Sequence, residues 1–415
     1  MKHSRIVITG LGTRSPNANG TPEYWNALQN GRSGIGAITL FPTENLACKI
    51  AGEVKNVSYD CLPFKDRKRV PRIVPIAVLA AEEALKDAGL PFESMTDLER
   101  QDIGVILGSG AGGVDFSERE YEKFFRGETH VSPFSIVSSF VGMVSSEVSI
   151  RFGFRGPSHV LSTGCTSSTD ALGYAAALLR SGMIRYVLSG GAEACITPGI
   201  LTAFVKMGTT TTRWNDQPQR ASRPFNIDRD GFVLSEGAWM LILETYENAV
   251  SRGAKIYAEL AGYASTCDAY HKVQIMPGGD ESARAIRLAL ERSRLTPDEV
   301  EYINLHGTAT TINDELETLV VKKVFNERSH RIPASSTKSM IGHPQGACGA
   351  AGIIATCMAI EKGIIHPTIN LDNPDPVCDL DYVPNVSRRA SIRIALCNTI
   401  AFGSKNSAIV LRKLE

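Results

Sequence analysis

The sequence alternates short β-branched segments with segments rich in alanine and leucine, and this alternation limits the fold more than any other feature. Strands alternating with helices predict a layered α/β architecture with largely parallel strand pairing. The expected strands are Arg5–Leu11, Asp102–Gly108, Ser158–Ser162, Tyr186–Ser189, Ile256–Tyr263, Tyr302–Leu305, Ile394–Asn398 and Ala408–Leu411. The expected helices are Ile73–Leu90, Thr166–Leu179, Ser282–Arg294, Glu315–Phe325 and Ala347–Glu361.

A similar order of segments occurs twice along the chain. Residues 1–255 hold the first series and residues 256–415 hold the second, and no low-complexity linker divides them. We therefore expect one compact body built from two similar halves. The small residues of the expected helix Ala347–Glu361 predict that this helix is buried on all sides.

Charge and cysteine usage exclude several classes of protein. The 415 residues include 44 basic and 44 acidic side chains, so bulk binding to nucleic acid or to an anionic membrane is not expected. The nine cysteines form no CxxC pair, which is unfavourable for a disulfide framework or a zinc site. The chain has no signal-peptide stretch and no apolar run of transmembrane length. These features predict a soluble cytoplasmic protein without a bound metal.

Cys165 is the candidate nucleophile. It lies in SHVLSTGCTSSTDALGYAAALL, between an expected strand and the start of an expected helix. Unpaired N–H groups at a helix N-terminus favour a thiolate, and Gly164 permits the sharp turn that such a site needs. A single cysteine is more often a packing residue, so this context alone does not establish a catalytic role.

Two histidines have contexts typical of functional residues. His306 in INLHGTAT ends an apolar strand and precedes a glycine, and His343 in SSTKSMIGHPQGACGAAG lies in a glycine-rich turn before a helix. Loops that follow strand ends often carry the chemistry of α/β proteins. A lone histidine of this kind is usually structural, but two together with Cys165 form a more specific set.

These motifs closely resemble those of the β-ketoacyl synthase family of the Cys-His-His type. The segments RPFNIDRDGFVLSEGAWMLILE (223–244) and NTIAFGSKNSAIVL (398–411) are also similar to signatures of the family. Within the family, STGCTSSTDALGYA, NDELET (313–318) and NPDPVCDLDYVPN (373–385) look most like the ketosynthase-alpha subunits of type II polyketide synthases. The elongation synthases of type II fatty-acid synthesis are the close second.

The resemblance implies a thiolase-like fold with five layers, α-β-α-β-α, and a dimer. It implies decarboxylative Claisen condensation, in which Cys165 carries the acyl chain while His306 and His343 stabilise the enolate formed from malonyl thioester. The thiolate is a soft nucleophile and a good leaving group, and two neutral imidazoles are suitable donors to an enolate oxygen. No metal or bound cofactor is implied, because the substrates are carried on the phosphopantetheine arm of an acyl carrier protein.

The resemblance also assigns supporting roles. Lys338 and Glu317 would orient the histidines, although an ion pair at the surface is their default interpretation. Thr308 and Thr310 would contact the phosphopantetheine arm. Backbone N–H groups of Cys165 and Phe402 would form the oxyanion hole.

Two positions depart from the pattern of the family. The usual Gly-Phe-Gly-Gly gating loop reads Ala401-Phe402-Gly403-Ser404 here, and alanine and serine tolerate positive φ poorly, which predicts a stiffer loop. Ala111 in GSGAGG stands where relatives often carry a bulkier residue near the acyl tunnel, which predicts room for a longer or bulkier chain. The alternative is that neighbouring side chains fill this space.

The segment KDRKRVPR (65–72) concentrates five basic residues against one acid. From charge alone a solvated face is the simpler interpretation. The resemblance places a docking helix for the acidic acyl carrier protein here. The expected docking residues are Lys65, Arg67, Lys68, Arg69 and Arg72, extended by Arg126 and Lys206.

Two other functions fit parts of the pattern. A chain-length factor, the non-catalytic partner of ketosynthase-alpha subunits, characteristically lacks the cysteine, whereas Cys165 is present here. Such a factor remains a candidate for the dimer mate, as does a second copy of this chain. A degradative thiolase needs a second cysteine near the C-terminus, and Cys397 falls in an expected strand rather than a glycine loop.

Overall fold

The computed structural model describes residues 4–414 and contains one sheet of ten strands. The strand order is β10-β9-β13-β14-β8-β1-β7-β6-β4-β5. The strands of the first half are β1 Ile6–Arg14, β4 Ile103–Gly108, β5 Ser158–Leu161, β6 Tyr186–Glu193 and β7 Gly237–Thr245. Those of the second half are β8 Ala258–Cys267, β9 Tyr302–Asn304, β10 Ala334–Ser335, β13 Ile394–Ala401 and β14 Lys405–Arg412. Two further sheets each consist of two short antiparallel strands: β2 Gly36–Ala37 with β3 Ile50–Ala51, and β11 Ile364–Ile365 with β12 Arg388–Arg389.

The two halves of the sheet have the same topology. In each half the first strand pairs antiparallel with the fifth, and the fifth pairs antiparallel with the fourth. The fourth then pairs parallel with the second, and the second pairs parallel with the third. Strands β1 and β8 join the halves through only two residue pairs, Val7 with Glu259 and Ile8 with Ala258. The repetition expected from the sequence is therefore a structural duplication.

The expectation of largely parallel pairing is wrong. Five of the nine strand pairs in the sheet are antiparallel and four are parallel. The error arises because β7, which lies between β1 and β6, was not recognised as a strand in the segment 223–244. The connection from β6 to β7 includes helix α8, Pro198–Lys206, yet β7 returns antiparallel to β6.

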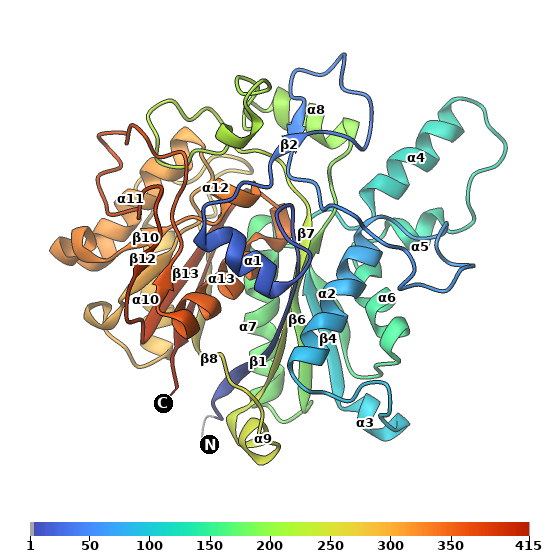
Figure 1. Ribbon diagram of the computed structural model, residues 1–415, viewed down its shortest axis with the longest axis horizontal. Helices are drawn as coiled ribbons and strands as arrows, with labels where there is room; N and C mark the ends of the chain where they lie inside the picture. Colours follow the sequence, from blue (N-terminus) through green and yellow to red (C-terminus); the bar gives the residue numbers. More distant parts are fainter. Residues whose placement is uncertain (1–3, 415) are drawn as a thin grey trace.

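The helices form the remaining layers, and equivalent helices occupy equivalent places in the two halves (Figure 1). Helix α7 and helix α13 lie between the sheet halves, α2 and α6 cover one outer face, and α10 covers the other with α11 beside it. The helices are α1 Thr21–Gln29, α2 Ile73–Asp87, α3 Asp97–Gln101, α4 Val114–Phe125, α5 Ser135–Ser139, α6 Met143–Phe152, α7 Ser167–Arg180, α8 Pro198–Lys206, α9 Tyr246–Ser251, α10 Asp280–Arg292, α11 Thr311–Phe325, α12 Lys338–Ile341 and α13 Cys348–Lys362. None of these helices is both long enough and apolar enough to cross a membrane.

Helix α13 is buried from Cys348 to Ile360, as its composition predicts. Its glycines allow neighbouring elements to approach closely. A Cβ atom added to Gly349 would lie 2.0 Å from Thr169 Oγ1 of α7, and one added to Gly352 would lie 2.3 Å from Asn304 Oδ1 of β9. Small residues in α13 therefore bring the helix-start segments of both halves together at the centre of the molecule.

We predict that Gly349→Ala lowers the free energy of unfolding. Thr169 Oγ1 is held by a 3.1 Å hydrogen bond to Thr399 Oγ1, so the added methyl group cannot be accommodated by a small shift. Alanine favours a helix over glycine by roughly 1 kcal/mol. The overlap is expected to outweigh this gain, so that the free energy of unfolding falls by about 1–3 kcal/mol. Urea denaturation measures the change. Gly36→Ala is the control, because a Cβ atom there meets nothing within 4 Å; equal destabilisation by both substitutions would contradict the prediction.

Candidate active site

Cys165 lies in a short 3-10 turn, Gly164–Thr166, between β5 and α7. Gly164 has φ +72°, the left-handed conformation that the sharp turn requires. The Cys165 side chain is buried and forms a small cluster with Cys348 and Ala401. The strand–glycine–cysteine–helix arrangement predicted from the sequence is therefore present.

Cys165, His306 and His343 converge from three distant segments of the chain. His306 follows β9, and His343 lies between α12 and the turn that leads into α13. Cys165 Sγ lies 3.2 Å from His343 Nε2, and the two imidazole rings lie 5.3 Å apart at an angle of 85°. The sulfur and one nitrogen of each ring lie within 4.8 Å of one another. A single thioester placed here can contact all three groups.

Glu317 and Lys338 hold His306 through its backbone. Glu317 on α11 accepts hydrogen bonds from the N–H groups of His306 at 2.6 Å and Gly307 at 2.7 Å, and from Asn398 Nδ2 at 2.7 Å. Lys338 at the start of α12 donates to the His306 carbonyl at 2.7 Å. All five residues are buried, so these bonds fix the loop that carries the imidazole.

Burial and charge keep both histidines neutral. Burial lowers the pKa of His306 well below its ordinary value, and the Lys338 ammonium and His343 lower it further. Burial and Lys338 likewise lower the pKa of His343. Burial raises the pKa of Glu317 to about 7, although its backbone donors oppose this shift. The imidazoles can therefore donate hydrogen bonds to a developing oxyanion without carrying a charge beforehand.

Burial opposes the thiolate that the helix N-terminus is predicted to favour at Cys165. Burial, the largest effect, raises the pKa of Cys165, and Cys348 and Glu193 raise it further. Lys338 and a hydrogen bond from the Phe402 backbone N–H lower it, but they do not reverse the shift. The thiol is thus protonated, and at 3.2 Å it can donate its proton to the neutral Nε2 of His343.

A cavity of about 410 Å³ opens onto the three groups. Thr308, Thr310 and Phe402 contribute to its wall, so the structure brings these predicted residues together with the candidate nucleophile. The complete lining is Cys165, Met207, Gly208, Thr209, Asp230, Gly231, Phe232, Val273, Gln274, Ile275, His306, Thr308, Thr310, Thr311, Ile312, Asn313, His343, Ile400, Ala401 and Phe402. A cavity of this volume is large enough for an elongated thioester-bearing arm.

Ala111 does not line this cavity. It is half-buried and packs beside an apolar cluster that includes Ile196 and Phe232. Its N–H donates to the buried carboxylate of Glu193 at 3.0 Å, and the same carboxylate accepts the N–H of Gly346 at 2.9 Å. Ala111 is therefore tied to the turn that follows His343 rather than to the open cavity.

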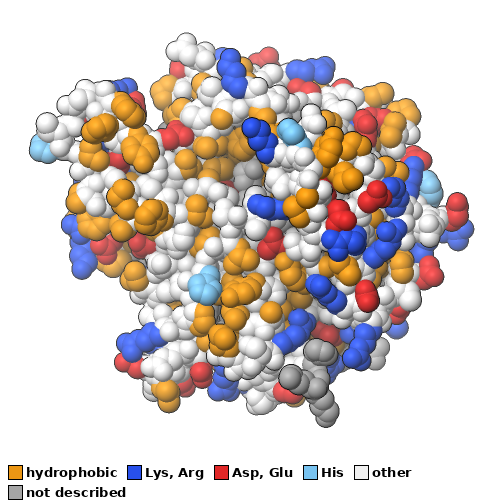
Figure 2. Space-filling view, turned by 180° about the vertical axis from the view of Figure 1, so that it is seen from behind, with side chains coloured by type: hydrophobic (Ala, Val, Ile, Leu, Met, Phe, Trp, Pro, Cys, Tyr) orange, Lys and Arg blue, Asp and Glu red, His pale blue; other side chains and the backbone are white. Residues whose placement is uncertain are grey.

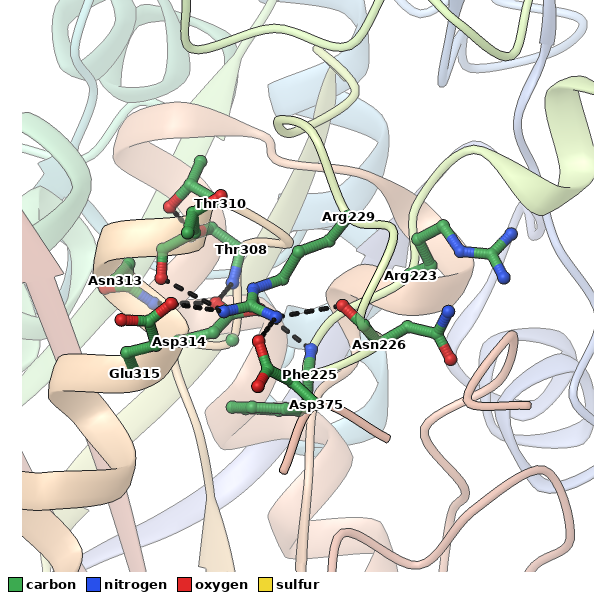
Figure 3. Close-up of polar contacts among 12 residues, drawn as sticks. Arg223, Phe225, Asn226, Arg229, Thr308, Thr310, Asn313, Asp314, Glu315 and Asp375 are labelled. Atoms are coloured by element: carbon green, nitrogen blue, oxygen red, sulfur yellow. Dashed lines mark hydrogen bonds and ion pairs between the residues drawn. The ribbon is translucent and has the colours of Figure 1, made fainter. Parts of the chain in front are cut away.

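An ion cluster that was not predicted from the sequence supports the threonine loop (Figure 3). Arg229 donates to Asp375 at 2.7 Å and to Glu315 at 3.1 Å, and its Nε lies 3.7 Å from Asp314. Asp314 in turn accepts the N–H of Thr308 at 3.0 Å. The arginine and Asp314 belong to quoted motifs, 223–244 and 313–318, but spacing alone does not reveal that these segments meet.

The segment 401–404, which the resemblance predicts to be a gating loop, is bonded to a neighbouring segment through Ser404. Ser404 has φ +64°, as a glycine normally would, whereas Ala401 pairs regularly with Lys405 at the end of β13. The Ser404 hydroxyl donates to the His271 carbonyl at 2.9 Å and accepts the N–H groups of Tyr270 and His271 at 3.3 and 3.2 Å. A glycine at this position would lack all three bonds, and a stiffer loop stays a prediction.

The structure corrects the predicted docking helix. Residues 65–70 form turns rather than a helix. Arg72 is not available at the surface, because its guanidinium is bonded to the buried Glu236 at 2.7 Å. Arg67 pairs with Asp60 at 2.7 Å, and Arg126 pairs with Glu122 at 2.5 Å. The remaining residues of the predicted patch are exposed: Lys65, Lys68, Arg69 and Lys206.

The three converging groups also resemble a metal-ligand set. One sulfur and two ring nitrogens within 4.8 Å are suitable ligands for zinc, with a fourth position open. The ammonium of Lys338 lies close enough to lower the pKa of both histidines, and the same positive potential disfavours a divalent cation. The site is better suited to an anionic oxygen than to a metal.

A duplicated α/β fold with a buried thiol and two neutral imidazoles defines an enzyme that handles thioesters and stabilises enolates. Residues 3–249 match the family described as beta-ketoacyl synthase, N-terminal domain, and residues 257–372 match beta-ketoacyl synthase, C-terminal domain. The chain belongs to the β-ketoacyl synthase family, whose members are acyltransferases.

Relatives of two kinds cover the whole chain. The 3-oxoacyl-[acyl-carrier-protein] synthase 2 of Synechocystis sp. is 42% identical over 100% of this chain and 99% of its own length. The granaticin polyketide putative beta-ketoacyl synthase 1 of Streptomyces violaceoruber is 39% identical over 99% of each chain.

Solved structures confirm the thiolase-like fold of this family. A type II polyketide ketosynthase, solved in complex with its acyl carrier protein and bound to the hexaketide, has a TM-score of 0.91 at 34% identity over 100% of both chains. The ishigamide ketosynthase/chain length factor has a TM-score of 0.90 at 32% identity, again over 100% of both chains.

We predict that Ser404→Ala loosens the gating loop. The substitution removes three hydrogen bonds to the 270–271 backbone but leaves the residue in its positive-φ conformation. Each lost bond contributes about 0.5–1.5 kcal/mol, so amide exchange of residues 401–404 and 268–272 should accelerate about tenfold or more. Hydrogen–deuterium exchange with mass spectrometry measures the change. Ser265→Ala on β8 is the control; unchanged exchange in Ser404→Ala would show that the hydroxyl does not restrain the loop.

Proposed function

We propose that this chain is a β-ketoacyl-[acyl-carrier-protein] synthase that condenses malonyl-carrier with an acyl chain on Cys165 in type II polyketide biosynthesis. The convergence of Cys165, His306 and His343 at the base of one cavity is the observation that carries the proposal. In this proposal the half formed by residues 1–255 supplies the nucleophile, and the half formed by residues 256–415 supplies both histidines.

The first step transfers the acyl chain to the enzyme. His343 Nε2 accepts the thiol proton as Cys165 Sγ attacks the thioester carbonyl, and the proton then passes to the departing carrier thiol. Backbone N–H groups of Cys165 and Phe402 stabilise the tetrahedral oxyanion. The hydrogen bond from the Phe402 N–H toward the Cys165 side chain supports this assignment.

The second step decarboxylates the malonyl group and forms the new carbon–carbon bond. As carbon dioxide leaves, negative charge develops on the malonyl thioester oxygen. His306 and His343 donate hydrogen bonds to it, His343 in the neutral tautomer that carries its proton on Nε2. The resulting carbanion attacks the acyl thioester, the new bond forms, and Cys165 leaves as the thiolate. Each preorganised donor contributes about 3 kcal/mol to such a step. Glu317 and Lys338 position the loop of His306 and take no direct part in bond making.

The substrates arrive on the phosphopantetheine arm of an acyl carrier protein, and the chain needs no cofactor of its own. Thr308 and Thr310 line the cavity with their hydroxyls 2.9 Å apart, suitably placed to bind the amides of the arm. Lys206 immediately precedes Met207 and Gly208, which line the cavity, and is the best-placed docking residue. Lys65 and Lys68 add positive charge beside the exposed ring of Phe64.

Fatty-acid elongation is the second candidate. The identity of 42% to 3-oxoacyl-[acyl-carrier-protein] synthase 2 favours it, whereas the structural similarity to a type II polyketide ketosynthase favours the first. A non-catalytic chain-length factor is disfavoured, because Cys165 and both histidines are present and assembled. Mass spectrometry of the carrier-bound product after incubation with malonyl-carrier and the neighbouring subunits distinguishes polyketide from fatty acid.

A dimer completes the proposal. Strand β5 ends the sheet and has a free edge among the described residues, and a free edge readily pairs with another chain.

The arm formed by α4 and α5 exposes apolar side chains at the upper left of Figure 2. They include Tyr121, Phe124, Phe125, Ile136 and Val137. Apolar patches of this kind mark protein interfaces. The mate is a chain-length factor or a second copy of this chain.

We predict that Cys165→Ala and His306→Ala separate the two steps. Cys165→Ala should form no acyl-enzyme and no condensation product, yet it should still decarboxylate malonyl-carrier, because both imidazoles remain. His306→Ala should still be acylated but should decarboxylate about 10²–10³-fold more slowly. Intact-protein mass spectrometry detects the acyl-enzyme, and release of carbon dioxide reports decarboxylation. Condensation by Cys165→Ala would refute the assignment of the nucleophile.

We predict that Lys206→Glu weakens binding of the acidic carrier protein. Reversing one exposed charge should raise the Kd about threefold to tenfold at low salt, and the difference should shrink as salt screens the interaction. Fluorescence anisotropy with labelled carrier protein measures the Kd. Lys413→Glu is the matched control, since this exposed lysine lies near the C-terminus, on the opposite side of the molecule from α8 (Figure 1). An equal effect of both substitutions would show that only net charge matters.

A further inference from the structure

The side chain of Gln345 lies beside the nucleophile with half of its amide unused. Its Oε1 lies 3.9 Å from Cys165 Sγ, and only 8% of the residue is exposed. Its Nε2 is buried and has no hydrogen-bond partner among the residues that the structure describes. A buried N–H group without an acceptor costs about 1–3 kcal/mol, so this amide is present despite a penalty in stability.

The backbone holds Gln345 rigidly in place. Its φ is +37°, in the region that side-chain-bearing residues rarely adopt. On one side, the His343 N–H donates to the Val233 carbonyl at 2.7 Å. On the other side, the Gly346 N–H donates to Glu193 at 2.9 Å. Strain retained beside a nucleophile and fixed from both sides is typical of functional positions.

Gln345 lies beside Cys165 but is not part of the wall of the threonine-lined cavity. A Cβ atom on Gly110 would lie 3.9 Å from Gln345 Cβ, and Glu193 accepts the N–H groups of Gly110 and Ala111 at 2.7 and 3.0 Å. The side chain of Gln345 therefore runs from the 110–111 loop toward the nucleophile and does not border the cavity proposed for the carrier arm.

We propose that Gln345 selects acyl groups that carry an oxygen on their third carbon, to which its Nε2 donates a hydrogen bond. This inference rests on the function proposed above and identifies the class of acyl substrate. An unreduced β-keto chain and a β-hydroxy chain both present such an oxygen.

Distances support this assignment. The amide oxygen and nitrogen are about 2.3 Å apart, so Nε2 lies within about 6 Å of Cys165 Sγ. An oxygen on the third carbon of a Cys165 thioester lies about 4–5 Å from the same sulfur. The two atoms can therefore approach to a hydrogen-bonding distance of about 2.9 Å. A saturated chain offers no acceptor to Gln345 Nε2. The N–H group then stays unpaired in a site from which the bound chain excludes water.

The acceptance step can be tested without any later step. In acyl transfer from a thioester, the Cys165 S–C bond forms, the donor S–C bond breaks, and the Cys165 proton ends on the released thiol. Acetoacetyl-, 3-hydroxybutyryl- and butyryl-pantetheine have the same carbon count and differ only at the third carbon. Intact-protein mass spectrometry gives kcat/KM for acylation of Cys165 by each thioester.

We expect the wild-type protein to prefer each oxygenated thioester over butyryl-pantetheine about tenfold, because an unpaired buried donor costs about 1–3 kcal/mol. The larger of the two preferences identifies whether the unreduced or the reduced chain is the physiological donor. Gln345→Leu keeps similar volume without the amide and should lower both preferences about tenfold. Gln101→Leu is the matched control: Gln101 is exposed at the end of α3 and does not line the cavity, and the preferences should not change.

The outcomes separate this inference from the proposed function. Equal acylation of the wild type by all three thioesters, or a preference that persists in Gln345→Leu, overturns the role of Gln345 and leaves the condensing activity standing. Failure of the wild type to be acylated by any thioester refutes the proposed function itself. If Gln345→Leu does not fold, equal acylation of the wild type by all three thioesters still overturns the inference. Gln345→Glu, which keeps the shape but lacks the N–H donors, provides the second variant and should also lose the preference.

Discussion

The buried carboxylate of Glu317 is the interaction on which the geometry of the site depends. It joins α11 to the backbone of His306 and Gly307 and, through Asn398, to β13. Burying a carboxylate is unfavourable unless several donors satisfy it, and three donors meet Glu317 here. A group held in this way has one stable arrangement, because each displaced donor leaves a charged oxygen unpaired. The backbone that carries the His306 imidazole is therefore fixed before any substrate arrives.

The same burial determines the chemistry of the other groups. Two histidines that would titrate near neutral pH in water remain uncharged, and the Cys165 thiol keeps its proton. Lys338 is the nearby cation, and it bonds to a backbone carbonyl rather than to the reacting groups. Its field favours negative charge in the site while leaving the imidazoles free to donate. An oxyanion that forms during the reaction is therefore stabilised by dipoles that are already oriented.

The sequence predicted the elements that carry the site better than it predicted their neighbours. The turn at Cys165 was recognisable because glycine, a β-rich segment and an alanine-rich helix occur in a fixed local order. The motifs around His306 and His343 were recognisable for the same reason.

By contrast, β7 was missed because its apolar run follows a loop-like motif, and the pairing direction of the sheet was misjudged as a result. The burial of Arg72 against Glu236 and the partnership of Arg229 with Asp314 depend on contacts between segments far apart in the chain. Residue type and spacing carry no information on such contacts.

The duplicated topology has a consequence for how catalytic competence arises. The nucleophile belongs to the half that ends with β7, and both imidazoles belong to the half that begins with β8. Strands β7 and β8 are separated by β1, and β1 and β8 join the two halves of the sheet through only two residue pairs. Packing of the buried helices α7 and α13 must therefore contribute most of the contact between the halves. Either half expressed alone would present an incomplete set of reactive groups, and chemistry would begin only when the two polypeptide pieces had docked. If the chain were cut between α9 and β8, catalytic activity would therefore measure how much of the protein had reassembled from its two pieces.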